Sequence, residues 1–311
     1  MKPKICVLGS IHMDYMITLD RMPKLGETLI GREFKMLPGG KGANQAVAAA
    51  RLGALVYMIG RVGEDLIGDE LVRNLQRNGV NVKHVKRAEA YSGVAFILVD
   101  SMGNNIIAVA PGADYHISRR DIDEALDDLK DVIDLLLLQL EIPIEIVEYA
   151  IKRFSEEGVK VILNPAPYHE LPAGTLSRVF IATPNIIELE LMSGVEVNCS
   201  EDVIEAGREA LEHLGIENLV VTLGARGAMI INRRSEKLIP AFEVKPIDTT
   251  GAGDAFNGAL AVALARGKTL EEAVTYANAA GALSTLKIGA QEALPTLADV
   301  EEFLREHGQR K

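Results

Sequence analysis

The sequence contains no tryptophan and only two cysteines, Cys6 and Cys199, in 311 residues. Two cysteines cannot build a disulfide framework, and no CxxC pair supplies a zinc site. Long apolar runs are also lacking, since even residues 132–138 are of strand length and include an aspartate. The N-terminus turns polar after a short apolar run, unlike a signal peptide. We therefore expect a cytoplasmic protein without a membrane partner.

Basic residues are fewer than acidic ones. The sequence has 33 Lys and Arg against 44 Asp and Glu, which gives a net charge of −11. This balance opposes binding to nucleic acid, so any anionic ligand must be met by local dipoles and a few placed cations. Hydrophobic residues make up 48% of the chain, enough for a sizeable core. With no linker or repeat in the sequence, we predict a single domain over residues 1–311.

Apolar runs of strand length alternate with segments of helical period through most of the chain. The predicted strands are residues 5–8, 55–59, 133–138, 159–163, 179–182 and 219–223. The predicted helices are residues 43–52, 66–78, 118–129, 143–156 and 201–213, followed by two nearly apolar ones at 252–266 and 270–286. This alternation predicts a doubly wound α/β fold, with a mostly parallel sheet covered by helices on both faces.

Two regions break the alternation with pairs of β-rich segments. Residues 15–19 and 28–36 form the first pair, and 91–100 and 105–110 form the second. We predict that they build a small separate β-sheet, formed by about 12–36 and 90–110, which acts as a lid. Such a sheet leaves one face and its edges open, which favours a homodimer that pairs through the lid.

The first glycine-rich segment, Gly39-Gly40-Lys41-Gly42-Ala43-Asn44, runs directly into a predicted helix. Its glycines allow close approach of a ligand to backbone N–H groups at the positive end of the helix dipole. Lys41 and Asn44 add donors suited to hydroxyl or phosphate oxygens. The spacing does not fit a Walker loop. The alternative is a glycine-rich turn that merely begins a helix.

The second segment, Asp248-Thr249-Thr250-Gly251-Ala252-Gly253-Asp254, begins the first of the apolar C-terminal helices. Consecutive N–H groups of Gly251, Ala252 and Gly253 can form an anion hole for a transferring group. Asp254 then lies beside that hole, where it can take a proton from an attacking hydroxyl. The alternative is an acid that only stabilises the first helical turn. The GxGxxG fingerprint of nicotinamide-dependent enzymes is absent, because Phe256 occupies the place of the third glycine.

Weaker signals follow several predicted strands. Asn185 and Glu188 are spaced either to bind phosphate-associated Mg²⁺ through water or to form a helix cap with a capping-box glutamate, and alone the cap is favoured. The segment 221–227 ends a strand in a glycine turn, where α/β sheets place ligands. Asp14 and Glu141 follow strands and are either acceptors for sugar hydroxyls or merely solvated acids.

Together these segments resemble the ribokinase-like (phosphofructokinase-B type) family of carbohydrate and nucleoside kinases. Residues 39–46 look like its first signature and 248–254 like its second, with matching motifs at 139–141, 164–167, 183–185 and 289–291. The resemblance implies Asp254 as the base, with an anion hole at Gly251, Ala252 and Gly253. The predicted sugar contacts at the matching positions are Asp14, Gly39, Gly40, Lys41, Asn44, Glu141 and Asp254, and His12 is added to them although it departs from the family pattern. The implied contacts for ATP and its Mg²⁺ are Asn185, Glu188, Thr222, Gly224, Ala225, Gly227, Gly253 and Asn278.

The resemblance also implies a monovalent cation, K⁺, beside the anion hole. The matching positions are Asp248, Thr250, Ser284, Lys287, Gly289 and Ala293, several of them acting through backbone carbonyls. The side chains of Lys287 and Asp248 could equally form a structural salt bridge.

One departure concerns His12, where the family usually has asparagine. An imidazole can carry charge near neutral pH and cannot present both a carbonyl and an amine. It could bond a sugar hydroxyl or meet an extra phosphate on the substrate. We predict transfer of the γ-phosphoryl group of ATP to the 5-hydroxyl of D-ribose. The alternatives are a nucleoside or ribose 1-phosphate as acceptor, another phosphoryl donor, and a sugar-binding sensor without catalysis.

Overall fold

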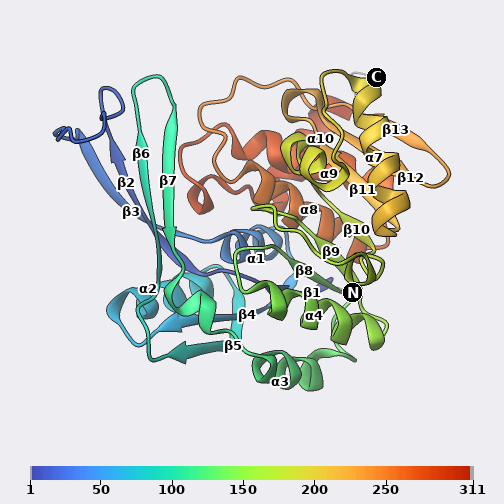
Figure 1. Cartoon of the computed structure of the whole chain (residues 1–311), viewed down its shortest axis with the longest axis horizontal. Helices are drawn as coiled ribbons and strands as arrows, with labels where there is room; N and C mark the ends of the chain where they lie inside the picture. Colours follow the sequence, from blue (N-terminus) through green and yellow to red (C-terminus); the bar gives the residue numbers. More distant parts are fainter. Residues whose placement is uncertain (1, 309–311) are drawn as a thin grey trace.

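The larger of two sheets forms the centre of the molecule (Figure 1), in a computed structural model that describes residues 2–308. Its strands are β1 (Lys4–Leu8), β4 (Leu55–Gly63), β5 (Val80–Ala88), β8 (Leu135–Leu138), β9 (Lys160–Leu163), β10 (Ile181–Ala182), β11 (Asn218–Thr222), β12 (Ala228–Asn232) and β13 (Glu236–Ile239). Their spatial order is β13-β12-β11-β10-β9-β8-β1-β4-β5. Every neighbouring pair from β11 to β5 is parallel, whereas β12 and β13 pair antiparallel at one edge.

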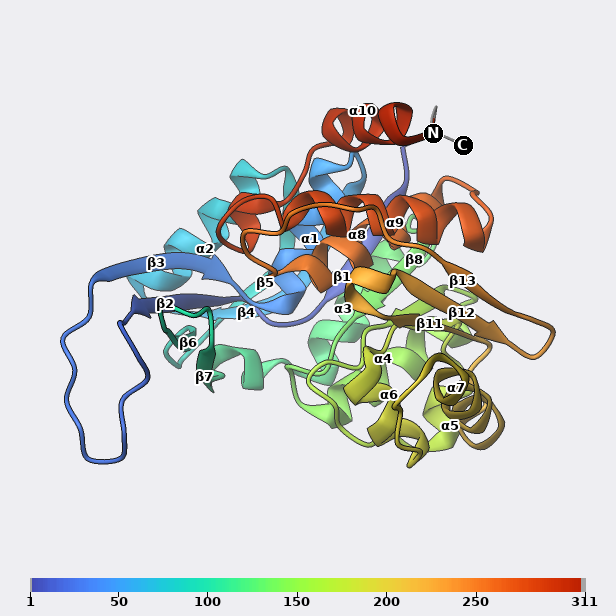
Figure 2. The same ribbon diagram turned by 90° about the horizontal axis from the view of Figure 1, so that it is seen from above.

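Helices cover both faces of this sheet (Figure 2). One face carries α1 (Lys41–Arg51), α2 (Leu66–Arg77), α8 (Ala252–Ala265), α9 (Leu270–Ser284) and α10 (Leu297–Gly308). The other carries α3 (Arg119–Leu129), α4 (Ile144–Glu156), α5 (Ala173–Leu176), α6 (Ile186–Ser193) and α7 (Ser200–Leu214). The predicted doubly wound α/β fold is confirmed. None of the described helices combines the length and apolar character needed to cross a membrane.

Strand β1 shows why the sheet strands are continuously apolar. Ile5 and Val7 point into the core under α1 and α8, and Cys6 and Leu8 point into the second core under α3 and α4. All four side chains are fully buried. A strand covered on both faces has no solvent-facing positions, so the alternation typical of half-exposed strands is lost.

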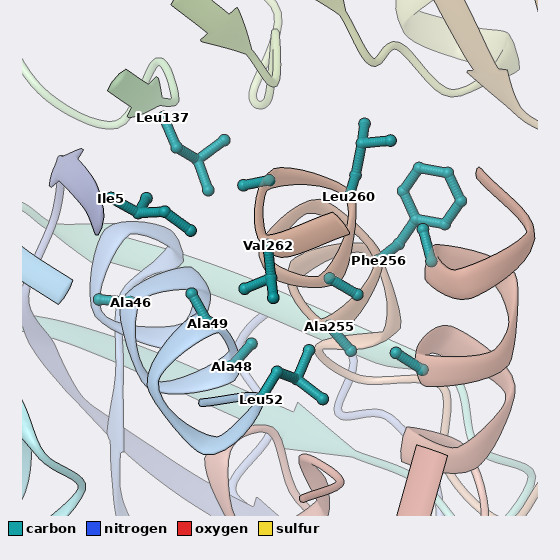
Figure 3. Packing of buried hydrophobic residues seen from close by; sticks show 14 of the residues in the cluster. Ile5, Ala46, Ala48, Ala49, Leu52, Leu137, Ala255, Phe256, Leu260 and Val262 are labelled. Atoms are coloured by element: carbon teal, nitrogen blue, oxygen red, sulfur yellow. The ribbon is translucent and has the colours of Figure 1, made fainter. Parts of the chain in front are cut away.

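Helices α1 and α8 approach each other unusually closely because small side chains line their contact (Figure 3). Ala48 and Ala49 of α1 face α8, and a Cβ atom on Gly258 would lie 2.6 Å from the Cβ of Ala48. A larger side chain at this position would force the helices apart. The close packing fixes the first turn of α8 beside the first turn of α1, where the two glycine-rich segments end.

The four-stranded second sheet is separate, as the sequence predicts, and extends from one end of the molecule (Figure 1). It contains β2 (His12–Thr18), β3 (Glu33–Gly39), β6 (Gly93–Val99) and β7 (Asn105–Ala110), in the order β3-β2-β6-β7. Tyr15 pairs with Met36 and Phe96, so these side chains share one face. His12 and Asp14 alternate with Tyr15 and therefore lie on the opposite face.

Several elements differ from the sequence prediction. Strand β3 begins at Glu33 instead of residue 28, because the preceding segment leaves the sheet and exposes Ile30 at 95%. Strand β10 is reduced to two residues. Strands β5, β12 and β13 and helix α10 were not predicted. In β5, buried and exposed positions alternate irregularly, as expected for the last strand at a sheet edge.

Candidate active site

Asp254 lies in the first turn of α8 and is only 6% exposed. Asn44 donates from Nδ2 to its Oδ2 at 2.9 Å, and Gln45 donates from Nε2 to its Oδ1 at 3.0 Å. Burial raises the pKa of Asp254, against the opposing effects of Lys41, Asn44 and Gln45. The carboxylate is therefore held in place and is more basic than an exposed aspartate.

The turn before α8 brings two glycines to a polar cavity beside Asp254. Gly251 has a φ of 74°, and a Cβ atom there would lie 3.1 Å from the Cα of Ala290. Both the conformation and the close approach favour glycine. Gly251 and Gly253 line the cavity, whereas the N–H of Ala252 donates to the carbonyl of Thr249 at 3.2 Å. Of the three N–H groups predicted to form the anion hole, that of Ala252 is therefore already paired. The N–H groups of Gly251 and Gly253 remain as candidates.

The predicted sugar-binding residues converge from four segments of the chain. His12 and Asp14 lie on β2, Gly39 ends β3, Gly40 and Lys41 begin α1, and Glu141 follows β8. Glu141 accepts the backbone N–H of Lys41 at 3.0 Å and the hydroxyl of Ser10 at 2.6 Å. A side chain on Gly39 would overlap the Asp14 carboxylate. These residues therefore lie close together, in one cluster with Asn44 and Asp254.

His12 lies between two carboxylates and is 5% exposed. Its Nε2 is 3.4 Å from Oδ1 of Asp14, and its Nδ1 is 3.6 Å from Oδ2 of Asp114. Burial lowers the pKa of His12, but Asp114, Glu141 and Asp14 together raise it above its usual value. Burial raises the pKa of Asp14 to about 6, and it does the same for Asp114. The acids around His12 thus favour its charged form.

A larger cavity of about 780 Å³ lies at the first turn of α8, beside the residue that precedes Asp254. It contains the predicted nucleotide-binding residues Thr222, Gly224, Ala225, Gly227, Gly253 and Asn278. The smaller polar cavity, about 170 Å³, contains Lys41, Asn185, Glu188, Gly251 and Asp254. Thr222 and Gly253 line both, so the two cavities meet at the first turn of α8. In a ligand that filled both cavities, the part that passes from one cavity to the other would lie beside Asp254.

Asn185 and Glu188 form the capping box that the sequence favoured. The Asn185 side chain accepts the N–H of Glu188 at 2.8 Å, and Glu188 Oε2 accepts the N–H of Asn185 at 2.8 Å. Burial raises the pKa of Glu188. The cap leaves Oε1 of Glu188 available beside the polar cavity. This donor fits a divalent ion that arrives with nucleotide phosphates and keeps several waters.

The predicted cation positions are only partly drawn together. Asp248 accepts the backbone N–H of Thr250 at 2.9 Å and that of Gly289 at 2.9 Å, which joins two loops beside Gly251. Both loops also meet the end of α9, where the N–H of Asp248 donates to the carbonyl of Thr285. Loop carbonyls are suitable ligands for an alkali cation.

The remaining cation positions are less closely tied to this loop pair. Ser284 is buried and donates to the carbonyl of Gly281. Within residues 2–308, Lys287 makes no ion pair with Asp248, and no hydrogen bond links Ala293 to the loops. No three His, Cys, Asp or Glu side chains gather into a metal cluster in the described part of the chain.

Several residues of the site were missed by sequence reasoning. Gln45 stands inside the first glycine-rich signature, so its position was visible even though its contact with Asp254 was not. Asn164 binds Gln45 and follows β9, the kind of strand end at which ligands lie. The wall of the larger cavity formed by residues 241–246 is irregular loop, and it carries no sequence signal.

Comparisons with known proteins extend over nearly the whole chain. The profile of the family described as pfkB family carbohydrate kinase matches residues 2–297. The chain is 42% identical over 301 residues to ribokinase of Bacillus subtilis, covering 96% of this chain and 99% of that protein. It is 39% identical over 302 residues to deoxyribokinase of Salmonella typhimurium, covering 96% and 98%. The structure of Arabidopsis thaliana ribokinase complexed with ribose and ATP is similar with a TM-score of 0.89 and 31% identity, covering 98% of this chain and 99% of that one.

Proposed function

This chain belongs to the pfkB family of carbohydrate kinases, and we propose that it transfers the γ-phosphoryl group of ATP to the 5-hydroxyl of D-ribose. The products are ribose 5-phosphate and ADP. The observation that carries the proposal is the position of Asp254, which lies among the predicted sugar contacts and lines the smaller cavity where it meets the larger one. The similarity to ribokinases, one of them solved with ribose and ATP, supports the same substrates.

The catalytic step needs a base, a site for the transferring group and a compensating cation. Asp254 accepts the proton of the attacking hydroxyl. The N–H groups of Gly251 and Gly253, with the ammonium of Lys41, stabilise charge on the phosphoryl oxygens. Glu188 would help to hold a Mg²⁺ ion that arrives with the nucleotide, and that ion would supply further neutralisation of the phosphate charge. Phosphoryl transfer depends mainly on such positioning and electrostatics.

The charges around His12 favour an uncharged acceptor. Asp14, Asp114 and Glu141 all raise the pKa of this one imidazole, so acidic groups outnumber it at this place. A phosphate on the sugar would meet a surplus of negative charge. Ribose 1-phosphate is therefore disfavoured as acceptor. The side chains of His12 and Asp14 bind sugar hydroxyls instead, since buried Oδ1 of Asp14 has no hydrogen-bond donor within residues 2–308.

The second candidate acceptor is 2-deoxy-D-ribose. The deoxyribokinase relative is nearly as similar to the chain as the ribokinase relative. The two sugars differ by one hydroxyl, and a site that bonds this hydroxyl strongly rejects the analogue that lacks it. Within residues 2–308, Nδ1 of His12 and Oδ1 of Asp14 are among the buried side-chain atoms that have no hydrogen-bond partner.

The test is a coupled kinase assay with ATP and Mg²⁺ over D-ribose, 2-deoxy-D-ribose, ribose 1-phosphate and adenosine. We expect the highest kcat/KM with D-ribose and identification of the product as its 5-phosphate. A higher kcat/KM with 2-deoxy-D-ribose would replace ribose as the acceptor. Absence of ADP formation with every sugar would support the non-catalytic sensor. Repeating the assay with ADP as donor and with or without K⁺ tests the donor and the proposed cation at Asp248 and its neighbours.

We further propose that the small sheet is a lid over the sugar and pairs with a second copy of the chain. One face of the sheet carries His12 and Asp14. The other carries an aromatic stack in which the Tyr15 ring lies 6.0 Å from that of Phe34 and 5.5 Å from that of Phe96. Phe34 and Phe96 are each more than half exposed. Burying this apolar face against a copy of itself favours a homodimer. The cytoplasmic location stays a prediction.

Charge on that face should separate the two copies. We expect light scattering after gel filtration to give twice the chain mass for the wild type. Phe34→Asp should give the mass of one chain, because a carboxylate cannot be buried without a partner. Ile187→Asp, which charges an exposed apolar position on α6, is the control and should remain dimeric. A monomeric wild type would contradict the proposed dimer.

A further inference from the structure

Behind Asp254 lies a row of side-chain amides that all point their NH₂ groups in the same direction. Asn74 donates from Nδ2 to Oε1 of Gln291 at 2.6 Å. Gln291 donates from Nε2 to Oδ1 of Asn44 at 3.0 Å, and Asn44 donates from Nδ2 to Oδ2 of Asp254 at 2.9 Å. Each amide thus accepts from the residue behind it and donates toward the carboxylate. The row joins α2, the 291–293 turn, α1 and α8.

The far end of the row is a guanidinium. Arg51 donates from Nε to Oδ1 of Asn78 at 3.0 Å, and Asn78 donates from Nδ2 to the Asn74 carbonyl at 2.9 Å and to Asn74 Oδ1 at 3.4 Å. The same Arg51 also donates to the carbonyls of Gln291 and Leu294, at 2.7 and 2.9 Å. A guanidinium can only donate, and an ionised carboxylate can only accept. These two ends permit a single direction of donation through the amides between them.

We propose that Gln291 and Asn74 are positioning residues, which keep the NH₂ group of Asn44 turned toward Asp254. The proposal rests on the proposed role of Asp254 as base. An unrestrained asparagine amide can turn over and present its oxygen instead. With Gln291 donating to Oδ1 of Asn44, that rotation would break one hydrogen bond and set an oxygen against the carboxylate. Gln291 is 5% exposed and Asn44 6%, so water does not readily replace the lost partner.

The other oxygen of Asp254 is held independently. Gln139 donates from Nε2 to Oε1 of Gln45 at 2.6 Å, and Gln45 donates to Oδ1 of Asp254. If the row through Asn44 is reversed, Gln45 therefore still holds the carboxylate of Asp254 through Oδ1. We expect such a variant to fold and to retain part of its activity.

The row acts on the ionised form of Asp254. Hydrogen bonds from Asn44 and Gln45 lower the pKa of Asp254, as does the charge of Lys41, whereas burial and the charge of Glu141 raise it. Asp14 on β2 also faces Asp254, and Glu188 of α6 lines the same polar cavity. Turning the Asn44 amide over removes a stabilising donor from the carboxylate, so the pKa of Asp254 should rise.

Asn74→Asp reverses the row from a distance. A carboxylate at position 74 only accepts, so Gln291 must turn its NH₂ group toward it and its oxygen toward Asn44. Asn44 then donates to Gln291 and presents its oxygen to Asp254. We expect the acidic limb of kcat against pH to move up by about one unit, with kcat falling up to about tenfold near that limb. Asn74→Leu removes the donor without imposing the reverse direction, so its shift should be smaller.

The matched control is Gln76→Glu, which adds the same charge to the exposed side of the same helix. Its pH profile should equal that of the wild type. If Asn74 had only a structural role, Asn74→Leu should have the larger effect and Asn74→Asp the smaller one, because Asp keeps the shape of Asn and Leu does not. An unshifted limb in Asn74→Asp, or an equal shift in Gln76→Glu, would overturn the proposal.

Gln291→Met provides a second route, because it keeps the length of the side chain but cannot donate to Asn44. This variant should also move the acidic limb of kcat to higher pH. An unchanged limb in a folded Gln291→Met enzyme would likewise overturn the proposal. Failure of the base assignment looks different. In that case Asp254→Asn itself would retain turnover. A large loss in Asp254→Asn with no shift in the Asn74 and Gln291 variants rejects only the amide row.

Discussion

Asp254→Asn should lower kcat for ribose phosphorylation by about 10²–10⁴-fold, the usual effect of removing a general base. The substitution keeps the shape of the side chain but removes the group that takes the proton. Sugar and nucleotide contacts lie mainly on other residues, so both ligands should still bind. Steady-state kinetics give kcat, and calorimetric titration of ribose gives the affinity.

The pH dependence of kcat provides a second test of the role of Asp254. The base works only when ionised, and burial raises the pKa of Asp254 above its ordinary value. Activity of the wild type should therefore be lost as pH falls through this raised pKa, earlier than for an exposed aspartate. The residual activity of Asp254→Asn should lack that limb.

A suitable control is Asp121→Asn, which removes another buried carboxylate far from the site. Asp121 is 2% exposed and pairs with Arg61 at 2.9 Å and Lys86 at 3.1 Å. Its loss should lower the melting temperature and leave kcat of the folded protein nearly unchanged. Near-normal turnover in Asp254→Asn would show that another group removes the proton.

The parts of the fold that could be predicted are those with local causes. Continuous apolar strands and amphipathic helices indicate a covered parallel sheet, and the core on both sides of β1 confirms it. The two glycine-rich segments could be identified because close approach and a positive φ demand glycine, as at Gly40 and Gly251. Their meeting depends on Gly258, which allows α8 to pack against α1. The sequence contains that glycine, but its partner helix is apparent only in three dimensions.

The parts that could not be predicted depend on distant partners. Gln291 and Asn44 are 247 positions apart in the chain, and the sequence near either residue does not predict the hydrogen bond between them. The same holds for Asp114, whose pairing with His12 reverses the expected effect of burial on the imidazole pKa. Strands β12 and β13 extend the sheet antiparallel, so their connections lack the helices by which the other strands were found.

Lys41→Met should lower kcat by about 10²–10³-fold, comparable to the loss of a transition-state donor in other transfer enzymes. Lys41 is the cation among the residues of the polar cavity, which also contains Glu188 and Asp254. Asp254, Glu141 and Glu188 raise the pKa of Lys41 more than burial lowers it, so the ammonium is charged at neutral pH. Without it, the incoming γ-phosphoryl group approaches carboxylates that no side chain in this cavity offsets.

The effect should differ from that of Asp254→Asn in its pH profile. Lys41 lowers the pKa of Asp254, so Lys41→Met should move the acidic limb upward and keep it visible. Lys41→Arg keeps the charge, and we expect it to recover most of the limb position but only part of kcat, since the planar guanidinium is larger than an ammonium. Measuring kcat across pH for both variants separates charge from shape. An equal loss in Lys41→Arg and Lys41→Met, with no movement of the limb in either, would mean that the Lys41 side chain acts through its shape and not through its charge.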